Sequence, residues 1–424
     1  MIVDLHASCP FPNQLLHQKN ISSIGDSRND TRHFGNTTLT FDNDGDGDKE
    51  VIIGNISFNG LTYCHNGGNG DTSDVDEQDT LFPYYSHQAS LYSWPAAFRL
   101  DVNNDGLPDI ICSPNAQLSS ENVACAWYYQ NTGTVAQDEF SFVTDSLFTG
   151  DMIEAGENSF PVLIDVDGDG LKDLIVANRG FFSTGSNYVC AMSYYHNVGT
   201  NVFPSFQLVT KDWQNFSSLN QANMFPAFGD LDGDGDADMV CGIKDGTLIY
   251  FTNNAGVYSL TTPNYFGIDV GYNAVPQLID LNGDGKLDLV IGELNGNIDY
   301  YQNNGTASSP DFNTATNTFL GNVLVQTPGA LTGYSTPLFT KLTPSSPLTL
   351  FVGCERGFIY EYDSIENHIG GGSFHLVDSM FNQIQQGSNS TIAAADLNGD
   401  GMQELIVGNY RGGLTYYDTT RVDD

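Results

Sequence analysis

The stretch DVDGDGLKD, residues 165–173, followed by the apolar run LIVA, residues 174–177, decides the fold of this chain. It is a nine-residue loop with carboxylates at positions 1, 3, 5 and 9 and a glycine at position 6. Ca²⁺ takes six to eight oxygen ligands, and glycine lets a backbone turn sharply enough to wrap them around one ion. The stretch therefore predicts a calcium loop that leads into a strand.

The same loop occurs six times in the sequence, always with glycine at position 6. The predicted ligands are the side chains at positions 1, 3, 5 and 9 and the backbone carbonyl of position 7. They are Asp42, Asp44, Asp46, Asp48 and Glu50; Asp101, Asn103, Asp105, Leu107 and Asp109; Asp165, Asp167, Asp169, Leu171 and Asp173; Asp230, Asp232, Asp234, Asp236 and Asp238; Asp280, Asn282, Asp284, Lys286 and Asp288; and Asp396, Asn398, Asp400, Met402 and Glu404. Asp and Gly also suit ordinary turns, but six loops in one register favour about six structural Ca²⁺ ions.

The loops connect strands rather than helices. An EF-hand has similar first ligands but needs a bidentate Glu at position 12 and helices on both sides. Here position 12 falls in short apolar runs such as residues 51–53, 174–176 and 289–291. Such runs predict buried strands.

A seventh copy is hidden in the last interval between loops, which is about twice as long as the others. It begins at Lys341, and Lys341, Thr343, Ser345 and Thr349 stand where the other copies have ligands. We expect this unit to keep its place in the fold without an ion, with the lysine ammonium as a substitute charge.

Each repeat has the same order of parts. A first strand, often opened by proline, precedes the acidic loop, and a buried strand follows it. A third strand carries paired aromatics and often ends in Asn, as in YYQN at residues 128–131, and a weaker fourth strand closes the unit. Four antiparallel strands repeated seven times predict an all-β fold, a single seven-bladed β-propeller.

The predicted blades cover residues 37–82, 94–143, 159–209, 225–261, 275–320, 335–377 and 390–418. The last blade lacks its outer strand. We expect residues 1–36, around residues 2–5, to supply that strand and close the ring, since closure removes exposed sheet edges.

Composition narrows the classes of partner. The formal charge is -38, with only 14 Lys and Arg residues, while 40% of the chain is hydrophobic. Nucleic acids and anionic membrane surfaces need clusters of basic residues, so the composition argues against both as partners. No apolar run reaches the roughly 18 residues of a membrane span.

The start of the sequence does not resemble a signal peptide, because Asp4 and His6 interrupt any apolar core. Either the protein is intracellular or a signal segment has been removed. Extracellular calcium modules work at roughly 0.1 to 1 mM Ca²⁺, which favours a secreted or cell-surface protein. The seven cysteines have no zinc-ligand spacing, and Cys125 and Cys190 occupy matching places that would allow a bridge.

The motif D-x-[DN]-x-D-G-x-x-[DE] followed by an apolar strand resembles the FG-GAP/VCBS repeat family, from residue 39 to residue 417. Seven-bladed propellers of this family include integrin α-subunit heads, bacterial surface proteins and fungal lectins. The sequence FGDLDGDG at residues 228–235 also resembles the repeats of propellers exported by type IX secretion, although those propellers usually carry a C-terminal sorting domain. The resemblance implies the calcium ligands, but it implies no active site because the fold hosts many activities.

The family geometry places the calcium loops on one face and the longer connections on the other. Trp94 and Trp213 lie in these connections, where exposed rings could stack on sugars or anchor proteins. Arg179, Arg356 and Arg411 follow the second strand of their repeats, near the expected channel mouth, and could hold a carboxylate. The alternative roles are that the aromatics cover blade edges and that the arginines pair with the acidic surface.

The sequence contains no HExxH and no GxSxG motif, whereas its many carboxylates leave a paired acid/base site open. The favoured function is a calcium-stabilised binding or adhesion module that recognises a glycan or protein, as a monomeric propeller within a larger secreted protein. The alternatives are a carbohydrate-active enzyme, such as a polysaccharide lyase or hydrolase, and a spacer domain without a ligand.

Overall fold

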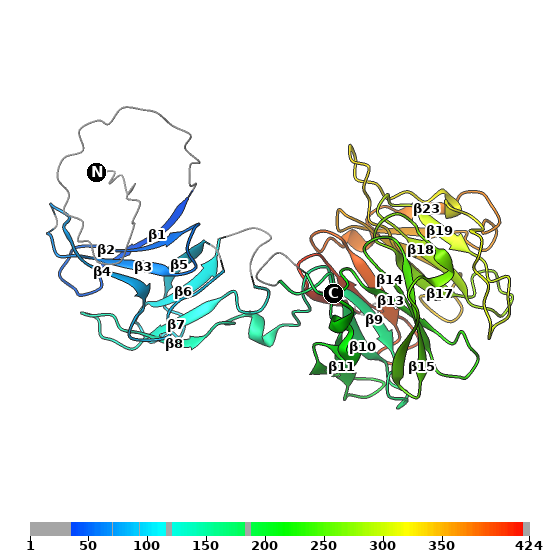
Figure 1. Cartoon of the computed structure of the whole chain (residues 1–424), viewed down its shortest axis with the longest axis horizontal. Helices are drawn as coiled ribbons and strands as arrows, with labels where there is room; N and C mark the ends of the chain where they lie inside the picture. The colour runs from blue at the N-terminus through cyan, green and yellow to red at the C-terminus, as the bar shows by residue number, and fades with distance from the viewer. Residues whose placement is uncertain (1–34, 70, 93, 116–120, 183–187, 419–424) are drawn as a thin grey trace. The chain divides into compact units, whose positions relative to one another are not determined.

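The computed structural model describes residues 35–418 except 70, 93, 116–120 and 183–187. The chain divides into two compact units, Met1–Asp151 and Met152–Asp424, which are described separately. In both units the strands form antiparallel sheets of three or four strands, seven sheets in all among the described residues (Figure 1). The predicted all-β fold is confirmed. The closing strand predicted around residues 2–5 lies outside the described residues.

Unit 1 contains two four-stranded sheets, each in sequence order. The strands of the first are β1 (Asn36–Phe41), β2 (Glu50–Asn55), β3 (Leu61–Asn66) and β4 (Val75–Phe82), and those of the second are β5 (Pro95–Leu100), β6 (Asp109–Pro114), β7 (Trp127–Asn131) and β8 (Phe140–Thr144). The short 3-10 helix η1 (Thr149–Asp151) follows. Phe41, Ile52, Ile110 and Phe140 belong to one buried cluster that holds the two sheets together.

Unit 2 contains the other five sheets. Their strands are β9 (Phe160–Ile164), β10 (Asp173–Ala177), β11 (Ser193–Asn197) and β12 (Phe206–Thr210); β13 (Phe225–Gly229), β14 (Asp238–Gly242), β15 (Leu248–Asn254) and β16 (Val257–Thr262); β17 (Val275–Ile279), β18 (Asp288–Gly292) and β19 (Ile298–Tyr301); β20 (Thr336–Thr340), β21 (Thr349–Gly353), β22 (Ile359–Asp363) and β23 (His375–Asp378); and β24 (Thr391–Ala395), β25 (Glu404–Gly408) and β26 (Leu414–Tyr417). Short 3-10 helices, η2 (Trp213–Leu219), η3 (Tyr265–Gly267), η4 (Leu320–Asn322) and η5 (Phe381–Gln383), lie in the connections.

One prediction about these sheets is wrong. The fifth repeat has three strands instead of four among the described residues, because the segment after β19 makes only an isolated bridge between Tyr300 and Asn317. Residues 313–317 of that segment, NTATN, lack the apolar side chains that occur in the fourth strand of another repeat, FQLVT at residues 206–210.

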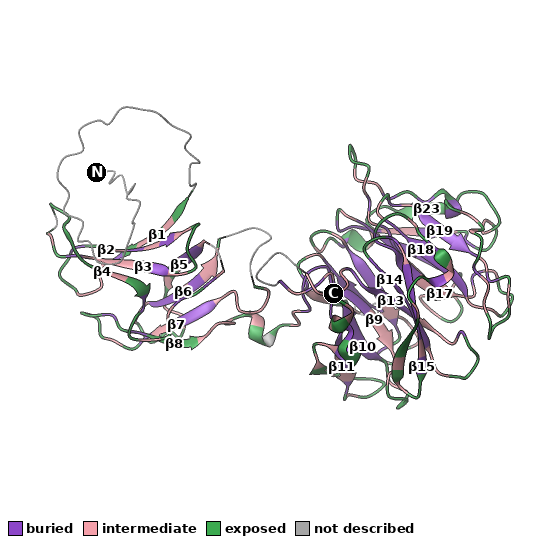
Figure 2. Ribbon diagram, in the orientation of Figure 1, coloured by how far each residue is buried: buried purple, intermediate pink, exposed green. Residues whose placement is uncertain are grey.

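The acidic loops are hairpins of one register. In each repeat the residue just before position 1 pairs with position 9, as Ile164 pairs with Asp173 and Ala395 with Glu404. The sixth repeat keeps the same pairing, between Thr340 and Thr349. The second strand of every sheet in unit 2 is buried at all five positions. Those labelled in Figure 2, β10, β14 and β18, appear purple there.

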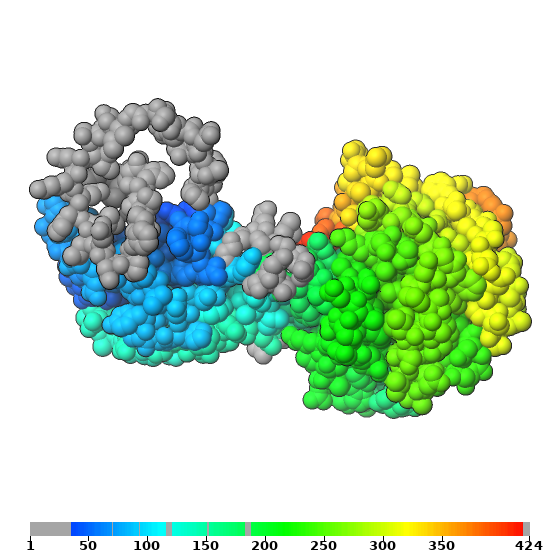
Figure 3. All heavy atoms as spheres, in the orientation of Figure 1, coloured from blue at the N-terminus to red at the C-terminus, as the bar shows by residue number. Residues whose placement is uncertain are grey.

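The five sheets of unit 2 form a closed ring. Successive sheets are joined by apolar clusters, and a further cluster joins the last sheet to the first of the unit, through Leu174 and Val176 against Leu397 and Ile406. The Thr391 hydroxyl also donates to the Ser159 carbonyl at 2.7 Å. In the space-filling view of Figure 3, the green and yellow segments of unit 2 lie directly against one another on the side that faces the viewer.

The seven predicted sheets are all formed, which is consistent with a seven-bladed propeller. A single ring of seven stays a prediction, because unit 2 by itself forms a ring of five in which the seventh sheet contacts the third. Cys190 is buried within unit 2, and the bridge to Cys125 of unit 1 stays a prediction. Within the described residues, none of the helices has the length and apolar character needed to cross a bilayer.

Candidate metal centres

The six acidic loops are built by the same hydrogen bonds. The position 1 carboxylate accepts the backbone N–H of position 6, as Asp165 accepts from Gly170 at 3.0 Å. The position 3 side chain accepts from the N–H of position 5, and the position 5 carboxylate accepts from the N–H of position 7. These bonds point side chains 1, 3 and 5 toward the inside of the turn.

Two positions of each loop have left-handed backbone. Position 6 is always glycine, with φ from 83° to 95°. Position 4 also has positive φ, and it is glycine in five loops and Asn104 in the other. Residues other than glycine and asparagine rarely adopt this conformation. The loop shape therefore explains the glycine at position 6 and also the glycine or asparagine at position 4.

The carboxylate at position 9 is fully buried in all six loops: Glu50, Asp109, Asp173, Asp238, Asp288 and Glu404. One of its oxygens usually accepts the N–H of position 2, as Asp109 does from Val102 at 2.9 Å. In four repeats the carboxylate also accepts the N–H of an Asn and the hydroxyl of a Tyr on the third strand; in the second repeat these are Asn131 at 2.7 Å and Tyr128 at 3.1 Å. The recurring Tyr and Asn of the third strand therefore anchor the buried end of the loop.

Acidic oxygens converge in three of the loops. The carboxylates of Asp42, Asp44 and Glu50, of Asp165, Asp167 and Asp169, and of Asp230, Asp232 and Asp234 each supply atoms within 4.8 Å of one another. In the other loops Asn103, Asn282 and Asn398 stand at position 3, so one charge fewer converges. Like charges this close repel each other, and a divalent cation would remove that cost.

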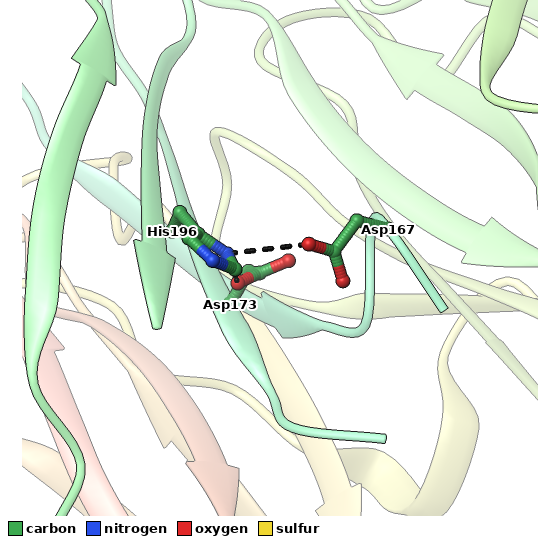
Figure 4. Close-up of side chains that lie close together, drawn as sticks. All are labelled: Asp167, Asp173 and His196. Atoms are coloured by element: carbon green, nitrogen blue, oxygen red, sulfur yellow. Dashed lines mark hydrogen bonds and ion pairs between the residues drawn. The ribbon is translucent and has the colours of Figure 1, made fainter. Parts of the chain in front are cut away.

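Histidines from the third strand reach two of these loops. Figure 4 shows His196 beside Asp167 and Asp173, with its Nδ1 at 3.4 Å from Asp167 Oδ2 and 3.1 Å from Asp173 Oδ1. His65 lies 2.6 Å from Asp76 and 3.2 Å from Asp44. The hydrogen bond with Asp76 raises the pKa of His65 to about 9, so its imidazolium supplies one positive charge to this acidic cluster.

The buried carboxyls at position 9 fit a cation. Glu50 Oε1 is buried and has no hydrogen-bond partner among the described residues. Burial raises the pKa values of Glu50, Asp288 and Glu404, and a bound cation would oppose this effect of burial on their charged forms. The donor set of carboxylates and backbone carbonyls is the one that Ca²⁺ prefers, so the six loops fit this ion.

The sixth loop is built differently. The N–H of Thr343 donates to the Ser346 hydroxyl at 3.0 Å, and the N–H of Ser346 donates to the Thr343 hydroxyl at 3.1 Å. Neither Pro344 nor Ser346, at positions 4 and 6, has positive φ. Lys341 is exposed and forms no ion pair with another described residue.

The two tryptophans proposed as ligand contacts differ in burial. Trp94 is partly buried, with φ of 50°, and its Nε1 lacks a partner among the described residues. Trp213 is only 5% exposed and packs edge-on against Tyr258, with ring centroids 5.0 Å apart, and against Phe216. The ring of Trp213 is therefore a core element and offers no face to a sugar.

The three arginines also differ. Arg179 donates from Nη1 to Glu157 at 3.1 Å and to the Tyr410 hydroxyl at 2.6 Å, and its guanidinium lies 4.5 Å from the centroid of the Tyr188 ring. Arg356 and Arg411 are exposed, and Arg356 lies 4.8 Å from the centroid of Phe358. Arg179 therefore has the structural pairing that we considered as the alternative, whereas Arg356 and Arg411 are accessible.

One pair of buried carboxyls lies outside the loops. Glu293 is 2% exposed and Asp299 is 8% exposed, and the side chain of Asp299 accepts an amide hydrogen from Asn297 at 3.2 Å. Burial, together with the charge of Glu293, raises the pKa of Asp299 to about 7. No sequence motif indicated this pair.

The fold and these loops define a class: an all-β repeat protein in which acidic hairpin loops begin the buried strands. The model of the FG-GAP-like repeat matches residues 101–176, 165–241 and 230–291, and that of the FG-GAP repeat matches residues 388–423. Together they cover more than half of the chain, and the chain belongs to the FG-GAP repeat family, as the motif predicted. No curated protein matches it.

Three solved structures align with most of the chain, all at low similarity. An Agrocybe aegerita lectin that recognises non-reducing terminal N-acetylglucosamine is 18% identical, with a TM-score of 0.31, over 90% of this chain and 93% of the lectin. BBS1N in complex with ARL6DN is 13% identical, with a TM-score of 0.27, over 92% and 95% of the two chains. Chaetomium thermophilum Raptor is 11% identical, with a TM-score of 0.26, over 92% of this chain and 29% of that one.

Proposed function

We propose that this protein is a calcium-stabilised binding or adhesion module, secreted or on a cell surface, that recognises a glycan or a protein. FG-GAP repeat proteins are commonly extracellular, and propeller-like repeats of this kind are typical of binding modules. Export by a type IX route stays a prediction from the wording of the repeats.

The observation that carries the calcium part is the recurrence of one hydrogen-bonded loop geometry with a buried acid at position 9. Six loops share it, and the sixth repeat does without it. About six structural ions, one for each acidic loop, would balance charges that the described residues leave uncompensated. Each ion holds the first two strands of a sheet together.

The binding part depends on the face opposite the acidic loops. In each hairpin sheet the turn after the second strand lies at the far end from the acidic loop, and there Arg356 and Arg411 are exposed on consecutive sheets of unit 2. Guanidinium groups can hold carboxylates bidentately. This favours an acidic glycan or an acidic protein segment as the ligand.

A carbohydrate-active enzyme is the second candidate, and the carboxylate-tyrosine cluster around Arg179 is the feature in its favour. The Tyr188 hydroxyl donates to Glu157 at 3.0 Å. Burial, with this hydrogen bond, raises the pKa of Tyr188 to about 12. A general base needs a pKa near the working pH, so this phenol is poorly suited to abstract a proton, and binding remains the favoured function.

The test is a screen of neutral and acidic glycans on the calcium-loaded protein that reads both retention and cleavage products. We expect calcium-dependent retention without products, weakened in Arg356→Ala and Arg411→Ala. Lys341→Ala, which removes an exposed cation from the opposite end of a sheet, is the matched control and should bind normally. Cleavage products would favour the enzyme, and silence toward every glycan would leave only a protein ligand or a spacer.

A further inference from the structure

A ring of left-handed residues marks the end of unit 2 that is opposite the acidic loops. The residue seven places before each loop has positive φ in every repeat. In unit 2 these residues are Asn158, Asn223, Asn273, Tyr334 and Asn389, with φ between 50° and 59°. They are here called the rim. Each lies two residues before the first strand of its sheet, and Asn tolerates left-handed backbone better than most residues.

The rim surrounds one small cavity. Asn158, Asn273, Tyr334 and Asn389 line it, and Asn223 is joined to them because its side-chain nitrogen donates to Asn273 Oδ1. The cavity has room for about one water-sized guest. Four sheets of unit 2 thus contribute a rim residue to the lining of the cavity, and the sheet that begins with β13 contributes Asn223 next to it.

The rim contains acceptors without donors. Oδ1 of Asn158 and Oδ1 of Asn223 are buried and have no hydrogen-bond partner among the described residues, and both side chains are 7% exposed. The neighbouring hydroxyl of Thr336 donates to the Ser390 carbonyl at 2.8 Å, and that of Ser335 donates to the Asn297 carbonyl at 2.6 Å. These hydroxyl hydrogens are therefore directed to backbone carbonyls and do not satisfy the amide oxygens.

Buried acceptors without partners are rare in proteins, and a bound water or ion usually accounts for them. We propose that the rim of unit 2 binds a monovalent cation of about the size of a water molecule, such as K⁺, through the amide oxygen of Asn158, which lines the cavity, together with that of Asn223, which adjoins it. Neutral carbonyl-type oxygens are the ligands that replace the hydration shell of K⁺. Ca²⁺ prefers the carboxylates that the loops supply, so the two kinds of site select different ions.

The ion would tie the first strands of the sheets together at the end where no acidic loop acts. The formal charge of -38 concentrates cations near the surface. Neither the proposed glycan or protein ligand nor the acidic loops take part in this site.

The test compares melting temperatures of the calcium-saturated full chain in KCl and in choline chloride at equal ionic strength. Ligand that binds only the folded state raises stability, and we expect K⁺ to raise Tm by about 2–4 °C, the shift typical of one modest site in a unit of this size. Asn158→Gly and Asn223→Gly allow the left-handed backbone but remove the amide, and they should lose this increment.

Asn382→Gly is the matched control, because Asn382 has φ of 47° and is exposed, and it should keep the increment. Equal Tm values in the two salts, or a full K⁺ increment in both rim variants, would overturn the proposal and leave an ordered water as the occupant. An increment confined to proteins with both rim amides would support it.

Discussion

The loops of the third and sixth repeats connect their strands in the same register and have the same length, yet only one is acidic. Ile164 pairs with Asp173, and Thr340 pairs with Thr349. The third loop has carboxylates at four positions, and the sixth has none. The sheet therefore does not need acids at this place to form its hairpin.

The sixth loop shows how a hairpin without carboxylates closes its turn. Its turn is closed by reciprocal bonds between Thr343 and Ser346, and Pro344 fixes a negative φ where the third loop has Gly168 at φ of 80°. Neutral hydroxyls satisfy the turn without repulsion. The acids of the other six loops thus have a different purpose, and binding a cation is the one that their geometry fits.

The largest effect should come from removing a first ligand. Asp165→Ala deletes the carboxylate that accepts from Gly168 at 2.7 Å and from Gly170 at 3.0 Å, and it removes the first ligand of the calcium ion that we propose for the third loop. We expect a loss of roughly 4 kcal/mol in saturating calcium, from one ion and two charge-assisted bonds. Lys341→Ala, at the equivalent position, should stay within about 0.5 kcal/mol. If urea unfolding gave equal losses of unfolding free energy for the two variants, the third and sixth loops would not differ as we propose.

The second prediction converts one loop into the other. Replacing residues 341–349 by the sequence of residues 165–173 restores the ligands and both left-handed glycines. The chimera should bind one more Ca²⁺ per chain than the natural protein, and at calcium 100 times the dissociation constant it should gain about 2.7 kcal/mol. Equilibrium dialysis counts the ions. An unchanged count would show that the register and the nine residues are insufficient.

The third prediction concerns Asp299, a buried carboxyl that lies outside the acidic loops. The pKa of Asp299 is raised to about 7, so the folded state holds its proton more tightly than the unfolded state, and stability falls as pH rises toward that value. Asp299→Asn should stabilise the protein more at pH 8 than at pH 5, by roughly 2 kcal/mol of extra gain. Thermal melts at both pH values measure it, and a constant gain would mean that Asp299 carries no such penalty.

The smallest effect concerns the anchor of the second loop. The Tyr128 hydroxyl donates to Asp109 at 3.1 Å, whereas the hydroxyl of its neighbour Tyr129 is buried without a partner among the described residues. Tyr128→Phe should cost about 1.5 kcal/mol, while Tyr129→Phe should be neutral or slightly stabilising because it removes an unsatisfied group. The reverse order in denaturant titrations would refute the anchoring role of the third strand.

Much of the fold could be predicted because the local sequence of each repeat determines its hairpin. The acidic loop, the glycine at position 6 and the following apolar run fix a hairpin of one register, and even the degenerate copy at Lys341 follows it. The bond partners could not be predicted. That Tyr128 and Asn131 anchor Asp109, or that Trp213 turns inward against Tyr258, depends on the packing of strands that are separate in sequence.

The sequence also does not indicate which two sheets meet to close the ring of unit 2, and the reason is physical. The sheets present similar apolar faces and similar Ser or Thr hydroxyls to their neighbours, so the repeats do not encode which copy meets which. The contact of Thr391 with Ser159 closes the ring of unit 2, and no motif distinguishes it from an equivalent contact between two other repeats. The rim asparagines were missed because a lone Asn before a strand is a weak signal, although its recurrence seven residues before the loops was visible in the sequence.

The central claim is that the six acidic loops hold structural calcium, and the melting temperature with and without a calcium chelator tests it most directly. At calcium 100 times the dissociation constant each independent site adds about 2.7 kcal/mol. Chelation should therefore lower Tm strongly, and added calcium should restore it. An unchanged melt in excess chelator would contradict the account.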